Sequence, residues 1–181
     1  MYSQNNEDEI IDKLFKKVGT TNRIFVEIGA GDGTECNTKA LRLKKWKGMA
    51  FDRNFANEDV VKKLITIDNV VKAVREVLSK RGVIEDEFDF LSIDVDGNDY
   101  YLLLQLLIDG LRPRVICIEY NKHFGMENRV QGYKHDSYWD QTSIDFGASK
   151  KALLLLLEPC GYEFYGTDCN NVNCFFIRKE K

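Results

Sequence analysis

The stretch I-F-V-E-I-G-A-G-D-G-T at residues 24–34, followed by G-M-A-F-D at residues 48–52, decides the fold of this chain. The apolar run that opens it is rich in β-branched and aromatic residues, which is typical of a buried parallel strand. Three glycines then fall within five positions, and they let the backbone turn sharply and approach a ligand; they are Gly29, Gly31 and Gly33. The second apolar run ends in Asp52, where nucleotide-binding α/β folds place a carboxylate that binds a ribose.

The acids around the glycine loop indicate which kind of cofactor it binds. A dinucleotide loop needs G-x-G-x-x-G, but Thr34 occupies the position of its third glycine. Glu27 and Asp32 flank the loop, and a pyrophosphate is a poor ligand beside two carboxylates. A nucleoside that carries an ammonium group and a sulfonium suits this loop better. Thr34 is expected to open a helix whose free N–H groups face the same place.

Length and composition favour an ordinary globular domain. The 181 residues, 44% hydrophobic and 30% charged, predict one domain over residues 1–181. A net charge of −3 provides no basic field, so no nucleic-acid partner is expected. No apolar run approaches the ~20 residues of a membrane span, and the polar, acidic start is unlike a signal peptide. We expect a cytoplasmic protein; its oligomeric state is left open.

Periodicity places helices and strands along the rest of the chain. A helix is expected at residues 6–18, with Asn6 and Glu9 as a capping box. Further helices are predicted at 34–45, 57–63, 70–82, 100–108 and 148–158. Strands are predicted at 24–28, 49–52, 64–67, 88–93, 115–118, 162–165 and 174–177, with Pro113 breaking the chain before the fifth. This order predicts a Rossmann-like, doubly wound, seven-stranded and mostly parallel sheet with a C-terminal antiparallel hairpin.

Polar residues follow the fourth and fifth predicted strands. The sequence D-V-D-G-N-D-Y at residues 94–100 gathers acidic and amide groups where ligands of open α/β sheets bind, so Asp94 is expected to face the cleft. A calcium loop is excluded, because the glycine falls one position early and the terminal glutamate is missing. A divalent metal held by Asp94 with Glu119 or Asn121 remains possible but is not predicted.

Asp68 and Asn69 follow the third predicted strand and have two possible roles. Either side chain could bind an adenine amino group, because the end of this strand lies near the nucleotide base in doubly wound sheets. The alternative, slightly preferred, is that they cap the next helix. The lead-in at residues 2–4 has a similar ambiguity, since it could cover the mouth of the cofactor site or fray.

The long connection at residues 121–146 is the expected substrate pocket. It has no sustained periodicity but many aromatic residues, and a loop of this length in a compact domain is usually functional. The substrate-binding candidates are Tyr133, His135, Tyr138 and Trp139. His123, together with Asp94, is the candidate general base for removing a proton from an acceptor. Either histidine could equally be an ordinary surface residue.

The glycine loop with its acids resembles the first motif of class I S-adenosylmethionine-dependent methyltransferases. The whole chain is similar to their FkbM-like family through S-Q-N-N-E-D, V-E-I-G-A-G-D-G, F-L-S-I-D-V-D-G-N-D-Y, I-E-Y-N and the closing N-V-N-C-F-F. The resemblance implies S-adenosylmethionine as cofactor and O-methylation of a hydroxyl on a sugar or other small metabolite. A nucleotide-dependent oxidoreductase and a non-catalytic cofactor-binding module are the alternatives.

Overall fold

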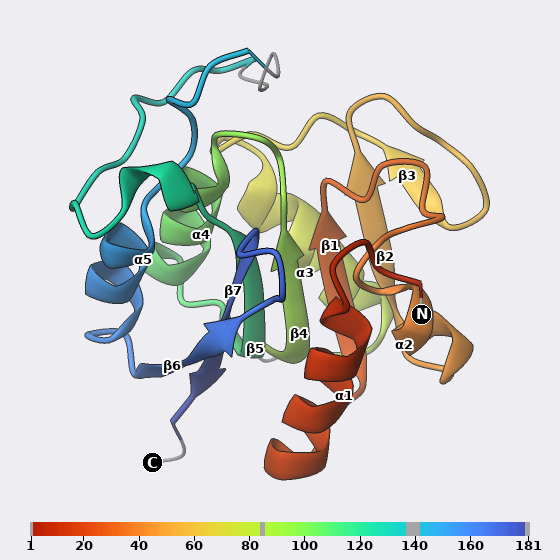
Figure 1. Ribbon diagram of the computed structural model, residues 1–181. Helices are drawn as coiled ribbons and strands as arrows, with labels where there is room; N and C mark the ends of the chain where they lie inside the picture. The colour runs from red at the N-terminus through yellow and green to blue at the C-terminus, as the bar shows by residue number, and fades with distance from the viewer. Residues whose placement is uncertain (1, 84–85, 137–141, 180–181) are drawn as a thin grey trace.

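A single seven-stranded sheet organises the protein in the computed structural model, which describes residues 2–83, 86–136 and 142–179. The strand order is β3-β2-β1-β4-β5-β7-β6, and β7 runs antiparallel to both of its neighbours (Figure 1). The strands are β1 Ile24–Ile28, β2 Lys47–Asp52, β3 Val60–Lys62, β4 Glu87–Ile93, β5 Arg112–Glu119, β6 Tyr162–Thr167 and β7 Asn173–Arg178. The predicted fold class is therefore confirmed.

Helices cover both faces of the sheet. They are α1 Glu7–Val18, α2 Lys39–Leu43, α3 Val70–Lys80, α4 Asp99–Ile108 and α5 Lys150–Leu157, with a 3₁₀ turn at Lys122–Phe124. Side chains of α3, α4 and α5 share one apolar core with the sheet, whereas α1 and α2 pack on the other face. None of the described helices is long and apolar enough to cross a membrane.

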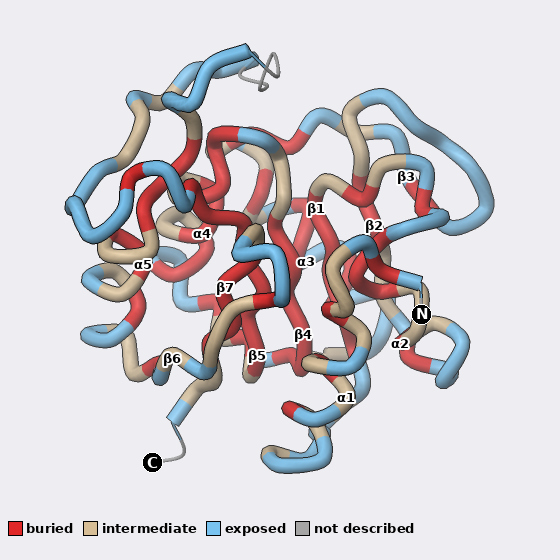
Figure 2. Tube along the Cα trace, in the orientation of Figure 1, coloured by how far each residue is buried: buried red, intermediate tan, exposed pale blue. Residues whose placement is uncertain are grey.

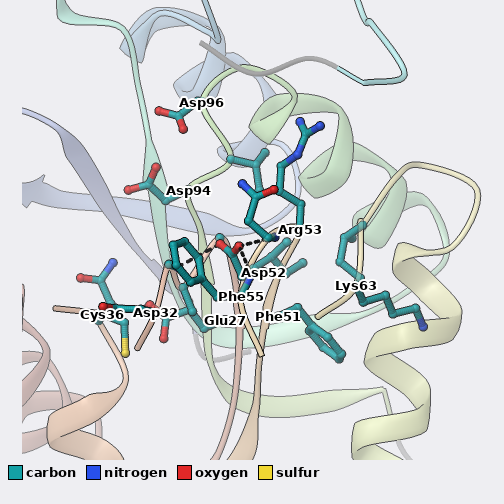
Figure 3. Close-up of a pocket in the computed structure, with 18 of the residues that line it drawn as sticks. Glu27, Asp32, Cys36, Phe51, Asp52, Arg53, Phe55, Lys63, Asp94 and Asp96 are labelled. Atoms are coloured by element: carbon teal, nitrogen blue, oxygen red, sulfur yellow. Dashed lines mark hydrogen bonds between the residues drawn. The ribbon is translucent and has the colours of Figure 1, made fainter. Parts of the chain in front are cut away.

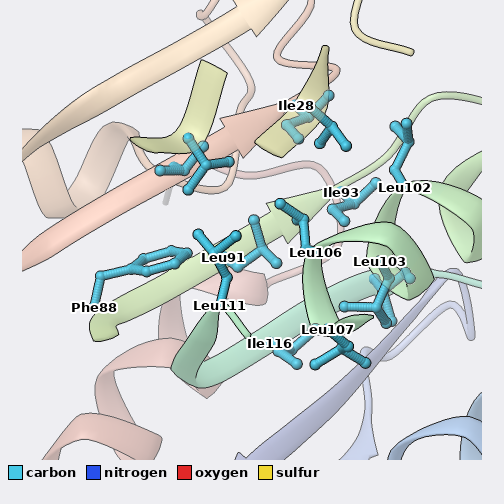
Figure 4. Close-up of a cluster of buried hydrophobic side chains, with 14 of the residues drawn as sticks. Ile28, Phe88, Leu91, Ile93, Leu102, Leu103, Leu106, Leu107, Leu111 and Ile116 are labelled. Atoms are coloured by element: carbon cyan, nitrogen blue, oxygen red, sulfur yellow. The ribbon is translucent and has the colours of Figure 1, made fainter. Parts of the chain in front are cut away.

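The larger core lies between α4 and the central strands. Figure 4 shows four leucines of α4 close to strand residues such as Leu91 and Ile116. The four, Leu102, Leu103, Leu106 and Leu107, are nearly or wholly inaccessible to solvent, as are the two strand residues. Burying one such side chain contributes about 1.5–3 kcal/mol. All five residues of β1 are buried, because strands flank it on both sides and helices cover both faces. The central strands of the sheet are consequently the most buried part of the chain (Figure 2).

The segment between β2 and α3 differs from its prediction. The predicted helix at 57–63 is wrong, because the Asn57 side chain accepts the N–H groups of Asp59 and Val60 and turns the chain into β3. Val60 is buried and pairs with Ala50 of β2. The predicted strand at 64–67 is also wrong, since residues 64–66 have no regular structure and a turn begins at Ile67.

The ends of the first helices also need correction. The helix predicted at 34–45 contains α-helix only from Lys39 to Leu43, because the preceding residues form turns beside the glycine loop. The Asn6–Glu9 capping box is wrong: Asn6 is left-handed and its side chain caps nothing. Ser3 and Asp8 instead exchange hydrogen bonds, each side chain accepting the other residue's backbone N–H.

Pro113 lies inside β5 and does not break the chain before it. It pairs with Phe88 of β4 on one side. Pairing with β7 begins only at Val115, so the missing N–H of the proline interrupts no hydrogen bond of that ladder.

Candidate active site

A cavity of about 930 Å³ opens at the carboxyl ends of β1, β2 and β4. This volume is typical of a small-molecule site. Figure 3 shows the labelled acidic side chains around it. Its walls come from the glycine loop, the strand ends, the loop after β4 and the start of the chain; among them are Gln4, Glu7, Glu27, Gly29, Gly31, Asp32, Asp52, Arg53, Phe55, Asp94, Asp96, Asn98, His135 and Asn173.

The glycines of the loop serve different purposes. A Cβ on Gly29, whose φ is +90°, would lie 1.6 Å from the backbone oxygen of Asp94, so β1 and the loop after β4 approach closely only because this residue has no side chain. Gly31 has a φ of +56°, and no atom of the described chain, apart from its own and its two neighbours' atoms, lies within 4 Å of where a Cβ would stand. A side chain there would thus extend into open space beside the cavity, where a ligand needs room.

Asp52 fixes the loop against the end of β2. Its Oδ2 accepts the N–H of Gly31 at 3.0 Å, and its Oδ1 accepts those of Asn54 at 2.7 Å and Phe55 at 3.1 Å. A carboxylate has about four acceptor positions, so Asp52 retains capacity for a ligand hydroxyl. Its half-buried side chain borders the cavity, and that it binds a ribose stays a prediction.

Glu27 and Asp32, the acids that flank the loop, lie in contrasting environments. Glu27 is only 2% exposed and accepts the N–H groups of Asn37 at 2.8 Å and Thr38 at 3.2 Å, together with the Thr38 hydroxyl. Burial raises the pKa of Glu27, and these hydrogen bonds oppose that rise. Asp32 is exposed, and its hydrogen bonds from Thr34 lower its pKa.

A group of carboxylates stands at the ends of β4 and β5. Asp94, Asp96 and Glu119 each place one oxygen within 4.8 Å of the others. Burial, followed by the charges of Asp99 and Asp96, raises the pKa of Asp94 well above its ordinary value. Asp99 accepts the N–H groups of Val95 at 2.8 Å and Gly97 at 2.9 Å, and thereby fixes the loop that carries the group.

Asn121, the other possible metal ligand, is engaged elsewhere. Its Nδ2 donates to the backbone oxygens of Ile144 at 2.7 Å and Phe146 at 2.9 Å. Its Oδ1 accepts the N–H of His123 at 2.9 Å. Asn121 therefore holds together the two ends of the 121–146 connection.

The substrate candidates are dispersed. His135 borders the cavity, whereas His123 is exposed and is not among its lining residues in the described chain. Tyr133 packs edge-on against Tyr101, with ring centroids 5.5 Å apart, and lies outside the described lining. Tyr138 and Trp139 fall outside the described residues.

Asp68 and Asn69 are likewise not among the described residues that line the cavity. Asn69 is the N-cap residue of α3, but its side chain makes no cap hydrogen bond. Instead its Oδ1 accepts the N–H of Thr66, and its Nδ2 donates to the oxygen of Leu64. Asn69 thus stabilises the turn before α3.

Sequence reasoning missed the cavity residues Glu7 and Asn173. Asn173 begins β7, and its Nδ2 donates to Glu7 Oε1 at 3.0 Å. Gln4 also borders the cavity, in agreement with the option that the lead-in covers the site. The signal that could have found them is the family resemblance, because Glu7 lies within S-Q-N-N-E-D and Asn173 within N-V-N-C-F-F.

The sheet order, the glycine loop and the acid after β2 together define a Rossmann-like methyltransferase. The chain matches the model of the methyltransferase FkbM domain over residues 9–164, and it belongs to that family. A comparison with curated proteins finds no match.

Two solved structures share the fold at low sequence identity. One is a putative O-methyltransferase from Klebsiella pneumoniae, with 12% identity, a TM-score of 0.50, and coverage of 97% of this chain and 81% of that one. The other is the Podospora anserina methyltransferase PaMTH1 bound to S-adenosylhomocysteine, with 15% identity, a TM-score of 0.51, and coverage of 98% and 80%.

S-adenosylmethionine is the cofactor, and the residues present fit it. The open space at Gly31 and the remaining acceptor position of Asp52 lie side by side on the cavity wall. The surrounding carboxylates favour a cationic ligand over a phosphate.

Proposed function

We propose that this protein transfers the methyl group of S-adenosylmethionine to a hydroxyl group on a sugar or another small metabolite. The observation that carries the proposal is the carboxylate-lined cavity, which joins the glycine loop and Asp52 to Asp94 and His135. A cofactor seated on the loop and an acceptor beside the β4 end would share this one space.

The chain's own residues position the reactants and exclude water. Bound S-adenosylmethionine supplies an electrophilic methyl group, and in-line transfer depends on orientation. We propose that Asp52 accepts a hydrogen bond from a ribose hydroxyl. Glu27 and Asp32 contribute negative potential for the ammonium group, Glu27 from within the wall and Asp32 from the rim. That Asp68 or Asn69 binds the adenine amino group stays a prediction.

Asp94 is the proposed proton acceptor for the substrate hydroxyl. It borders the cavity, and its raised pKa makes it a stronger base than an ordinary carboxylate. His135 is the second choice, because it also borders the cavity. That His123 acts as a general base stays a prediction, and the residue lies outside the described lining of the cavity.

We propose a small-molecule acceptor because the cavity has the size of a metabolite site and an acidic lining. Such a lining disfavours the phosphates of a nucleic acid. The 121–146 connection, which brings His135 to the cavity, is the proposed source of acceptor specificity.

Calorimetric titration with S-adenosylhomocysteine and, separately, with NAD tests the cofactor assignment. We expect saturable binding of the first compound only; binding of NAD alone would support the oxidoreductase instead. A mass-spectrometric screen of hydroxylated metabolites with S-adenosylmethionine then tests the reaction. A gain of one methyl group on an acceptor supports the proposal, whereas cofactor binding without transfer to any acceptor would favour the non-catalytic module.

A further inference from the structure

We propose that Asp94, Asp96 and Glu119 together bind one divalent cation at the edge of the cofactor cavity. The three residues come from the end of β4, the loop after it and the end of β5. These two strands are adjacent and parallel, with Ile93 paired to Ile118. The topology therefore brings the carboxylates to one point, and Figure 3 shows Asp94 and Asp96 one above the other on the cavity wall.

The spacing of the oxygens suits a single ion. One oxygen from each residue lies within 4.8 Å of the other two. An ion with oxygen ligands at about 2.0–2.6 Å spans about 4–5 Å between opposite ligands. One cation can therefore contact all three carboxylates with only small side-chain movements.

Glu119 provides an independent indication of a missing ligand. Its side chain lies at the end of β5 and is only 8% exposed, yet its Oε2 has no hydrogen-bond partner among the described residues. A buried acceptor without a partner destabilises the fold, and more so when it is charged. A cation among the three carboxylates would remove that cost.

The loop holds its shape through contacts that do not involve the proposed ion. The Asp99 carboxylate accepts the N–H groups of Val95 and Gly97. Asp96 sits at a φ of +57°, a left-handed conformation that Asp and Asn tolerate better than most residues. The site is thus pre-formed, and its carboxylate-only ligands favour Mg²⁺, Mn²⁺ or Ca²⁺ over metals that prefer nitrogen or sulfur.

The location also gives the ion a use, and this step alone rests on the proposed function. Asp94 and Asp96 border the cavity, so an open coordination position would face the acceptor. A hydroxyl bound to a divalent cation loses its proton more easily. With Asp94 bound to the ion, His135, which also borders the cavity, would accept that proton.

The site is tested by titrating the purified, chelator-treated protein with MnCl₂. Electron paramagnetic resonance and calorimetry measure the binding of Mn²⁺. Neither cofactor nor acceptor is present, so the result is separate from the test of methyl transfer. We expect one saturable site in the wild type, from which MgCl₂ or CaCl₂ displaces Mn²⁺. Glu119→Gln and Asp96→Asn should each weaken Mn²⁺ binding at least about tenfold, through loss of a charged ligand.

Glu163→Gln is the matched control, because Glu163 is exposed on β6, away from the three carboxylates, and should leave the affinity unchanged. Thermal unfolding without metal verifies that each variant is folded. The proposal is overturned if the wild type shows no saturable site up to about 1 mM Mn²⁺, the weak end of the known range. It is equally overturned if both ligand variants bind Mn²⁺ as the wild type does.

Discussion

At the scale of single residues, two glycines of one loop should respond differently to the same substitution. Gly29→Ala forces a methyl group onto the Asp94 backbone oxygen, so we expect a loss of several kcal/mol of folding free energy or no folded protein. Gly31→Ala meets no atom and should cost only about 1–2 kcal/mol for its left-handed backbone. Urea unfolding distinguishes them; equal losses would contradict this interpretation.

Asp52→Ala should weaken binding of S-adenosylhomocysteine by about 1–3 kcal/mol, because a ribose hydroxyl would lose a charged acceptor. Calorimetry measures the loss. Asp52→Asn serves as the control, since it keeps an acceptor oxygen and the side-chain shape while removing the charge. Unchanged affinity in Asp52→Ala would remove this residue from the cofactor site.

Residue types at strand ends were predictable from the sequence, but their partners were not. The glycines and Asp52 were predictable because a tight turn and the end of a strand depend on residues that are close together in the sequence. Glu27 was predicted as a cofactor contact, yet both of its oxygens accept hydrogen bonds from Asn37 and Thr38, ten and eleven positions away. Such a partnership depends on the path of the folded chain, which no local pattern encodes.

At the scale of elements, α5 should depend on its N-cap. The Ser149 Oγ accepts the N–H groups of Ala152 at 3.0 Å and Arg129 at 3.2 Å. Ser149→Ala should therefore reduce the free energy of unfolding by about 1–2 kcal/mol. Ser79→Ala, at an exposed position within α3, is the control and should be nearly neutral. A neutral Ser149→Ala in chemical denaturation would refute the capping role.

The contact between α1 and the end of α2 should respond to pH. Hydrogen bonds from Lys16 and Lys44 lower the pKa of Asp12 to about 2. Because the folded pKa lies below the unfolded value of about 3.9, this stabilisation is present above about pH 4 and is lost as the pH falls to about 2.

Asp12→Asn should accordingly cost about 0.2–1 kcal/mol at pH 7, the range for exposed ion pairs. The difference from the wild type should shrink toward zero near pH 2 and should also shrink at high salt. Urea titrations across this pH range provide the measurement. A difference that stays constant with pH would show that the charge of Asp12 contributes nothing.

Elements with strong periodicity were predicted well, and short ones were not. The 3.6-residue pattern located α1 and α3 because their apolar faces pack against the sheet. The β3 strand has only three residues, and the side chain of Asn57 directs the chain into it. A turn formed by an asparagine side chain and a strand of three residues are too short to produce a hydrophobic periodicity in the sequence.

At the scale of the whole molecule, the cofactor should stabilise the fold. A ligand at about 100 times its Kd adds about 2.7 kcal/mol to the folded state. For a chain of this size, S-adenosylhomocysteine should therefore raise Tm by about 5–10 °C. Differential scanning calorimetry measures the shift, and Asp52→Ala should reduce it at the same ligand concentration. A Tm that the ligand leaves unmoved would contradict the assigned cavity.

The position of β7 has a consequence for protein synthesis. The strand pairs with β5 and β6 on either side, and its first residue, Asn173, donates a hydrogen bond to Glu7 in the lining of the cavity. A ribosome makes these two residues 166 positions apart. A growing chain that stops short of β7 therefore has an incomplete cofactor cavity and a β6 strand without its neighbour. The chain becomes able to bind the cofactor only late in synthesis, when β7 is added.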